Sequence, residues 1–107
     1  MGHSTQRITG ITDSENGDGV KRFALKGNLD EELSSQLEKS LLSGSIPADQ
    51  KVILDFAEVP MVTPDGIRVL LNTSFQFDEG GLIVENPNND VQQLLRTVGL
   101  ESLVKIN

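Results

Sequence analysis

Side chains that could take part in chemistry gather in the short stretch Thr63–Gly66, which reads TPDG. The stretch lies between an apolar run, Val52–Leu54, and a second apolar pattern of helical period. A hydroxyl from Thr63 and a carboxylate from Asp65 are therefore expected at a helix N-terminus, where the helix dipole favours an anion. Because no suitable general base accompanies them, they do not form a catalytic set. We expect this stretch to act as a binding surface.

Motifs for metals, nucleotides and redox groups are absent from the sequence. There is no cysteine, which excludes disulfides, thiolate catalysis and cysteine-ligated zinc. The carboxylates near Thr63–Gly66 lack the D-x-D-x-D-G spacing of a calcium loop, and no G-x-x-x-x-G-K motif offers a phosphate cradle. We therefore assign no cofactor and no metal, and we expect no enzymatic activity.

The charge of the chain is strongly acidic, with 16 acidic residues, 9 basic residues and a formal net charge of −7. Nucleic acids and anionic membranes bind basic surfaces, so neither is an expected partner. The acidity is compatible with a basic protein partner, and also with solubility alone.

Length and hydropathy predict one cytoplasmic domain over residues 1–107, with Met1–Ser4 disordered or left over from cloning. No apolar run approaches the roughly 18 residues of a membrane span, and no signal-peptide core follows Met1. We expect no membrane insertion.

Hydrophobic periodicity predicts an N-terminal β-hairpin followed by alternating helices and strands. Strands that alternate with helices imply parallel pairing, so the expected class is α/β with the order β-β-α-β-α-β-α-β and an antiparallel edge. The expected elements are strands at Thr5–Thr12, Val20–Leu25, Lys51–Phe56, Leu82–Val84 and Leu103–Ile106, turns at Asp13–Gly19 and Asn86–Asp90, and helices that start near Asp30, Thr63 and Val91.

Each predicted helix has an apolar face that should pack against the sheet. The expected inner faces are Leu33, Leu37 and Leu41 in the first helix, Ile67, Leu70, Leu71, Ser74 and Phe75 in the second, and Val91, Leu94, Leu95 and Val98 in the third. Gly99 is expected to end the third helix in the left-handed conformation. The compact run in Lys51–Phe56 predicts a strand that is buried on both faces.

Polar residues predict how the first two helices begin. Asp30 is expected to cap the first helix, with the acidic pair Glu31–Glu32 in its first turn. The second helix has Thr63 at the N-cap position, Pro64 at N1 and Asp65 at N2, which is a sound helix start.

Several stretches together match the pattern of a known family. They are Leu25–Asp30 (LKGNLD), Val52–Phe56 (VILDF), Val62–Leu70 (VTPDGIRVL), Gly80–Gly81, Asn86–Pro87 and Leu94–Leu100 (LLRTVGL). In this order the chain resembles the STAS domain, most closely the stand-alone bacterial anti-sigma-factor antagonists. The resemblance implies a mixed sheet of four to five strands with helices packed mainly on one face.

The resemblance also implies a role in transcription regulation by partner switching. In the family, an unphosphorylated antagonist binds an anti-sigma factor, which is a serine kinase of the histidine-kinase-like ATPase superfamily, and thereby frees a sigma factor. Phosphorylation of the serine before the motif glycine breaks that contact. The residues that correspond to the partner-binding loop and helix are Asp30, Thr63, Pro64, Asp65, Gly66, Ile67 and Arg68.

This chain departs from the family at the phosphoacceptor position, where Asp65 replaces the serine. Pro64 stands at the preceding serine position, Thr63 stands at the motif's aspartate position, and Gly66 is retained. Three interpretations of Asp65 remain open: a structural residue of the helix start, a mimic of the phosphorylated state, or part of a surface with a different partner.

Neighbouring residues have alternative interpretations as well. Thr63 is a helix cap or an alternative phosphoacceptor, and Asp30 is a cap or the acidic residue near the family's switch site. Asp55 is expected to organise the loop after its strand, and Arg68 is expected to be solvated or to face an acidic partner.

A second function is an adaptor subunit of an ABC-type lipid-transport complex, or another signalling scaffold, which need not be phosphorylated. In both cases the edge strand of the N-terminal hairpin offers a surface for a homodimer.

Overall fold

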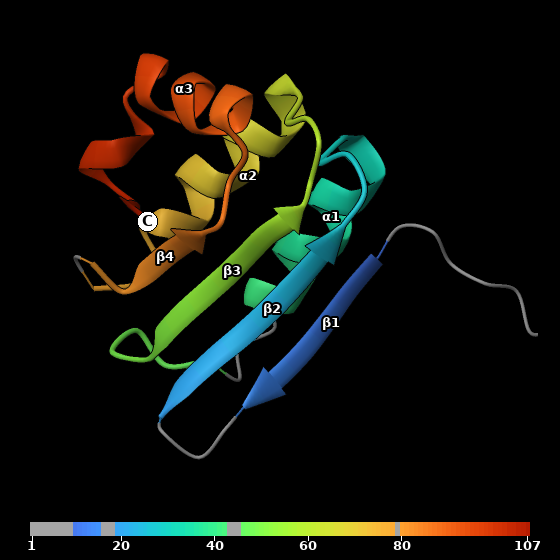
Figure 1. Cartoon of the computed structure of the whole chain (residues 1–107). Coiled ribbons are helices and arrows are strands. Elements are labelled where there is room, and N and C mark those ends of the chain that lie inside the picture. Colours follow the sequence, from blue (N-terminus) through green and yellow to red (C-terminus); the bar gives the residue numbers. More distant parts are fainter. Residues whose placement is uncertain (1–9, 16–18, 43–45, 79) are drawn as a thin grey trace, which may run out of the picture.

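The sheet of the computed structural model contains five strands in the order β1-β2-β3-β4-β5 (Figure 1), and the structure describes residues 10–15, 19–42, 46–78 and 80–107. β1 is antiparallel to β2, and every later pairing is parallel. The α/β class and the predicted element order are confirmed. The elements are β1 (Gly10–Glu15), β2 (Val20–Lys26), α1 (Glu31–Leu41), β3 (Lys51–Glu58), α2 (Pro64–Ser74), β4 (Leu82–Glu85), α3 (Asn89–Thr97), the 3-10 helix η1 (Leu100–Ser102) and β5 (Lys105–Ile106).

The first strand reaches further into the expected turn than predicted, and residues 5–9, where its start was predicted, lie outside the described residues. β1 pairs with β2 from Gly10↔Lys26 to Glu15↔Lys21, so Asp13–Glu15 belongs to the strand and not to the turn. The prediction was wrong because turn-forming residue types were weighed above the pairing that β2 offers to them. Residues 1–9 and 16–18, which include Met1–Ser4 and part of the expected turn, lie outside the described residues.

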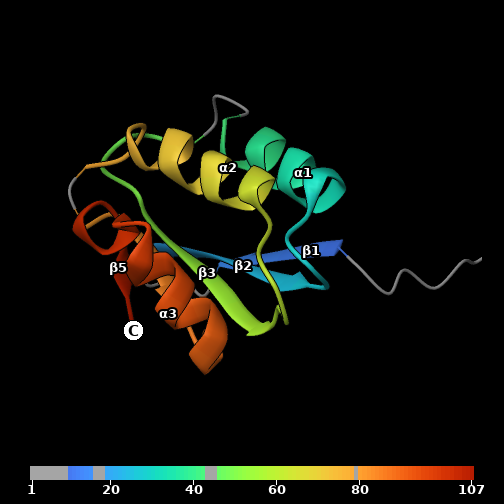
Figure 2. The same cartoon turned by 90° about the horizontal axis from the view of Figure 1, so that it is seen from above.

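Helices α1 and α2 lie side by side across one face of the sheet, and α3 lies beside the start of α2 where β3 and β4 end (Figure 2). The strands turn one set of side chains toward α1 and α2, and these side chains are buried. They include Phe23, Leu25, Val52, Leu54, Phe56, Leu82 and Val84. On the other face of β3, Ile53 is 6% exposed, which agrees with the predicted burial of this strand on both faces. None of the described helices has the length and apolarity needed to cross a bilayer.

The inner face of α1 was predicted correctly, and that of α2 only in part, since Leu70 and Ser74 are buried as predicted. Leu33, Leu37 and Leu41 are buried in α1. In α2, Leu71 is 38% exposed and Phe75, just after the helix, is 67% exposed.

Small and polar residues occupy the buried positions of α2. Gly66, Val69, Leu70, Thr73 and Ser74 face inward. The buried Thr73 hydroxyl donates to the Val69 carbonyl at 2.6 Å, so its burial leaves no unsatisfied donor. Apolar periodicity alone missed Gly66 and Thr73 and assigned Leu71 and Phe75 to the core in their place.

The end of α3 also differs from the prediction. Val91 and Leu95 are buried and Leu94 is half-buried, but Val98 is 47% exposed. Gly99 has the predicted left-handed conformation, with φ of 83°, and the chain turns there into η1. Leu100 enters the core directly after this turn, which leaves Val98 at the surface.

The remaining differences concern element ends. β3 runs on to Glu58 and α3 already begins at Asn89. β5 contains only Lys105–Ile106, because the N–H groups of Leu103 and Val104 donate to the Leu100 carbonyl in the turn that follows η1. Such shifts arise because hydrogen-bond pairing extends beyond the apolar positions that the sequence marks.

Two adjacent leucines test the orientation of α2. Leu70→Ala removes a fully buried side chain and should lower the free energy of unfolding by about 2–5 kcal/mol. Leu71→Ala should lower it by less than about 1 kcal/mol, because that side chain already contacts water. Urea unfolding followed by far-UV circular dichroism measures both values. Equal losses for the two variants would contradict the observed orientation.

Candidate protein-interaction site

The loop that leads into α2 is tied to the segment that leads into α1. Leu29, which has no exposed surface, forms an isolated parallel bridge with Val62. Its N–H donates to the Met61 carbonyl at 2.9 Å, and its carbonyl accepts from the Thr63 N–H at 3.1 Å. These bonds continue the β2–β3 pairing beyond the strands and place the start of both helices at one end of the sheet (Figure 1).

Gly66 makes the close approach of these two segments possible. A Cβ atom at this position would lie 2.7 Å from the Leu29 carbonyl oxygen and 2.8 Å from Cγ1 of Val62. Real Cβ atoms do not occur at such distances, and the nearest obstacle is backbone, which cannot turn aside. The motif glycine therefore sets how deeply the first turn of α2 sits against Leu29.

Asp30 caps α1 as predicted. Its carboxylate accepts the Leu33 N–H at 3.1 Å, and Glu31 and Glu32 occupy the first turn. Because Asp30 follows Leu29 directly, the acidic start of α1 lies beside the loop that leads into α2.

Thr63 occupies the predicted N-cap position of α2, but its side chain does not cap the helix. Its Oγ1 donates to the Leu29 carbonyl at 3.0 Å, and the same carbonyl also accepts the Thr63 N–H. The predicted capping bond, in which Oγ1 would accept an N–H of the first turn, is absent because the hydroxyl turns toward the Leu29 carbonyl, which the bridge to Val62 brings close. Pro64 at N1 needs no such cap for itself, since it has no N–H.

Asp65 and Arg68 form an ion pair on the surface of α2. The Asp65 Oδ1 atom lies 2.6 Å from Arg68 Nη2, and the two side chains are 40% and 64% exposed. Arg68 is thus exposed as predicted, but it contacts a carboxylate of its own helix. Exposed pairs of this kind contribute about 0–1 kcal/mol to stability. The carboxylate of Asp65 therefore lies at the surface, at the positive end of the helix dipole, with one cation beside it.

Asp55 organises the end of β3 as predicted, and Asn86 and Asn88, to which the prediction gave no separate role, hold the neighbouring loops. The Asp55 carboxylate accepts the Ala57 N–H at 3.0 Å and the Asn86 side-chain amide at 3.2 Å. Asn88 caps α3 through the Val91 N–H at 2.8 Å and donates to the Pro60 carbonyl at 3.2 Å. The sequence signal was present, since Asn86–Asn88 follows the strand next to β3 and parallel strands end at the same edge.

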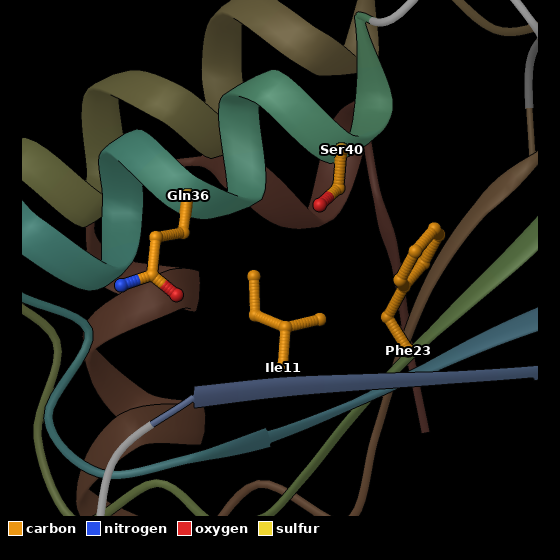
Figure 3. Close-up of a pocket in the computed structure, with 4 residues that line it drawn as sticks. All are labelled: Ile11, Phe23, Gln36 and Ser40. Atoms are coloured by element: carbon orange, nitrogen blue, oxygen red, sulfur yellow. The ribbon is translucent and has the colours of Figure 1, made fainter. Parts of the chain in front are cut away.

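A hollow elsewhere on the molecule lacks the groups for chemistry. It lies between α1 and the first two strands, has a volume of about 310 Å³, and is lined by Ile11, Phe23, Gln36 and Ser40 (Figure 3). The side chains of Gln36 and Ser40 come from α1 and lie across from Ile11 on β1. None of the four is an acid or a base. Over the described ranges, no group of three or more histidines, aspartates or glutamates is placed to hold a metal ion.

The structure thus brings together Asp30 and the stretch from Thr63 to Arg68 where α1 and α2 begin. Ile67 is half-buried beside this corner, and Pro64 is exposed at its surface. The arrangement presents carboxylates, one guanidinium and apolar side chains on a rigid helix start. Such a surface is suited to contact a protein, and the described corner holds no nucleophile paired with a base.

Comparison with known proteins agrees with this geometry. The family model described as "STAS domain" matches residues 12–107, so the chain belongs to the STAS domain family. A search of curated proteins gave no significant match.

Solved structures with the same fold include an anti-sigma factor antagonist from Mycobacterium paratuberculosis. Its TM-score is 0.73 at 19% identity, over 90% of this chain and 84% of the other. The Bacillus cell fate determinant SpoIIAA in its phosphorylated form has a TM-score of 0.65 at 16% identity, over 91% and 90%. The murine anion transporter Slc26a9 has a TM-score of 0.65 at 19% identity, over 80% of this chain but only 16% of the transporter. At these identities the likeness is one of fold.

The close approach at Gly66 leads to a stability prediction. Gly66→Ala should lower the free energy of unfolding by about 1–3 kcal/mol, because the added methyl group forces the first turn of α2 away from Leu29. Asn72→Ala, at an exposed position of the same helix, is the control and should change it by no more than about 0.5 kcal/mol. Chemical unfolding of both variants supplies the values, and a Gly66→Ala protein as stable as the control would show that the approach is not a constraint.

Proposed function

We propose that this chain is a non-enzymatic, cytoplasmic protein-interaction domain of a partner-switching system. In this proposal it binds an anti-sigma factor, a serine kinase of the histidine-kinase-like ATPase superfamily, through Asp30 and the stretch Thr63–Arg68. The observation that carries the proposal is the rigid start of α2, held against Leu29 by Gly66 and displaying Asp65 outward. The family membership and the antagonist structures with the same fold support it.

In the anti-sigma-factor antagonists that the chain resembles, a serine that becomes phosphorylated occupies the position of Asp65. We infer that Asp65 partly mimics the phosphorylated state. Its structural role is small, since its side chain pairs with Arg68 at the exposed surface of α2 and such pairs add little stability. A carboxylate supplies about one negative charge, whereas a phosphoseryl group supplies about −1.5 to −2. Arg68 offsets part of that charge, so the mimicry is incomplete. A domain of this kind binds its kinase weakly and does not respond to the kinase's phosphorylating activity.

Thr63 is a poor alternative phosphoacceptor in this structure. Its hydroxyl is half-buried and donates to the Leu29 carbonyl, so a kinase must break that bond to reach the oxygen.

Replacing Asp65 separates the effect of charge from the effect of a phosphorylatable hydroxyl. Asp65→Ser should tighten binding to the kinase encoded near this gene roughly tenfold, which corresponds to about 1.4 kcal/mol, and should gain one phosphate with ATP. Asp65→Asn is the matched control, because it removes the charge at nearly constant shape; it should bind as tightly and gain no phosphate. Calorimetry measures the affinities and intact mass spectrometry counts the phosphates.

The mimic would be rejected if both variants bound the kinase with the affinity of the parent protein. Phosphate that persists on Asp65→Ser but disappears when Thr63→Ala is added would assign the modification to Thr63 instead.

A second candidate is an adaptor subunit of a transport complex, in particular an ABC-type lipid transporter. The observation that favours it is the fold shared with part of the Slc26a9 anion transporter. In this role the chain should co-purify at fixed stoichiometry with an ATPase and a permease encoded beside it. Asp65→Ser should leave that assembly unchanged, because no phosphorylation step is involved. Native mass spectrometry of the tagged chain decides, and absence of an ATPase from the purified complex would exclude this role.

A further inference from the structure

Four of the five large hydrophobic side chains that are exposed among the described residues belong to α2, α3 or the loop before α2. The five are Leu42, Met61, Leu71, Phe75 and Val98. All except Leu42 lie in the loop before α2, on α2 and its C-cap, or at the end of α3. Scattered exposed hydrophobics need no explanation, but a gathered set marks an interaction surface.

A groove between α2 and α3 lies within this set. One hollow has a volume of about 250 Å³ and is lined by Val62, Pro64, Ile67, Leu94 and Val98, which are all apolar. A second hollow of about 260 Å³ shares Val62 and Leu94 with the first, so the two adjoin. The second adds Pro60, Met61, Asp90 and Val91. We call these two hollows together the α2–α3 groove.

The apolar surface continues from the α2–α3 groove along α2. Ile67, Leu71 and Phe75 are spaced four residues apart, and residues at this spacing lie on the same side of a helix. The core accounts for Ile67 in part, since this side chain packs against it, but not for the exposed Leu71 and Phe75. Phe75, which is 67% exposed, therefore contributes little to the core and adds to the exposed apolar surface of α2.

The charges around the groove select the kind of partner. Asp30, Glu31, Glu32 and Asp90 are exposed at the starts of α1 and α3, and Asp90 lines the groove itself. The basic residues of this side are matched by acidic ones within the chain. They form the pairs Arg68–Asp65, Arg96–Glu101 and Lys26–Glu58. The excess charge at the groove is thus negative.

This excess argues against two occupants. In a symmetric dimer each copy presents the same surface to the other, so the carboxylates of the two copies would repel one another. An anionic membrane is repelled for the same reason.

We propose that the α2–α3 groove binds a segment of a protein partner that inserts an aliphatic or aromatic side chain and places lysine or arginine beside Asp90 and the start of α1. The proposal deepens the proposed function, because the groove adjoins the Thr63–Arg68 stretch through Pro64 and Ile67. In this proposal the α2–α3 groove provides most of the affinity for the partner, and Asp65 determines how that binding is regulated.

Two model peptides test the chemistry without requiring the natural partner. One is an amphipathic helical peptide of leucine and lysine, and the other has the same pattern with glutamate in place of lysine. Each is titrated into the full chain carrying methyl labels for NMR. The leucine–lysine peptide should shift the methyl signals of Ile67, Leu94 and Val98, and the leucine–glutamate peptide should leave them unchanged.

A matched pair of variants on α3 locates the contact. Val98→Lys places a cation in the groove, near a helix C-terminus that favours it, so the protein should stay folded while peptide affinity falls about tenfold. Gln93→Lys adds the same charge at an exposed position of α3 that does not line the groove, and should leave the affinity within about twofold. Circular dichroism confirms that both variants are folded.

Several results would overturn the proposal. They are equal shifts with the leucine–glutamate peptide, shifts confined to other surfaces or none, and equal losses in the two variants. Sedimentation that reveals a dimer abolished by Val98→Lys would assign the groove to a second copy of the chain.

Measuring kinase binding by the same protein variants tests this inference separately from the proposed function. A chain that binds the peptide in the groove but not the kinase upholds the inference and refutes the anti-sigma role. A chain that binds the kinase but shows none of the expected peptide shifts does the reverse.

Discussion

The packing of Gly66 against Leu29 is the constraint on which the site depends. Two backbone segments that are far apart in sequence meet there, and the space between them excludes even a methyl group. The Leu29 carbonyl accepts both donors of Thr63, so the loop before α2 has no freedom to move away from the start of α1. A binding surface built on such a junction is pre-organised, which reduces the entropy lost when a partner docks.

This junction also determines the electrostatics of the site. It brings the N-termini of α1 and α2 to the same end of the sheet, where their dipoles favour negative charge. Asp30, Glu31 and Asp65 lie in or just before these first turns. A helix N-terminus stabilises a phosphate group for the same physical reason as it stabilises the carboxylate of Asp65.

Helix α2 has a buried side that packs on the core and an exposed side that carries apolar groups. Its buried side carries Gly66, Val69, Leu70 and Thr73, which are small or moderate in size and let the helix approach the core closely. Its opposite side carries larger apolar groups that the core does not need, ending in Phe75. Ile67 is half-buried: it packs against the core and also lines the α2–α3 groove next to the start of the helix.

The outcome of the sequence predictions follows the same division. The element order, the α1 stripe of Leu33, Leu37 and Leu41, the cap at Asp30 and the turn at Gly99 were all predicted correctly. Each of these depends on residues that are close in sequence. The outward orientation of Leu71, Phe75 and Val98 was missed, because hydrophobicity indicates that a side chain can be buried and not that it is.

By itself, therefore, the sequence determined the local structure, the family resemblance and the replacement of the family's serine by aspartate at position 65. Only the tertiary structure decided that Thr63 donates to Leu29 instead of capping α2, and that Asp65 pairs with Arg68. It also decided that Asn88 holds the loop at Pro60. The contacts of Thr63 and Asn88 join segments that are 34 and 28 residues apart in the sequence. The pairing of Asp65 with Arg68 depends on how α2 packs, because packing decides which of its side chains reach the surface. Chain folding brings such groups together, and periodicity along the sequence does not record it.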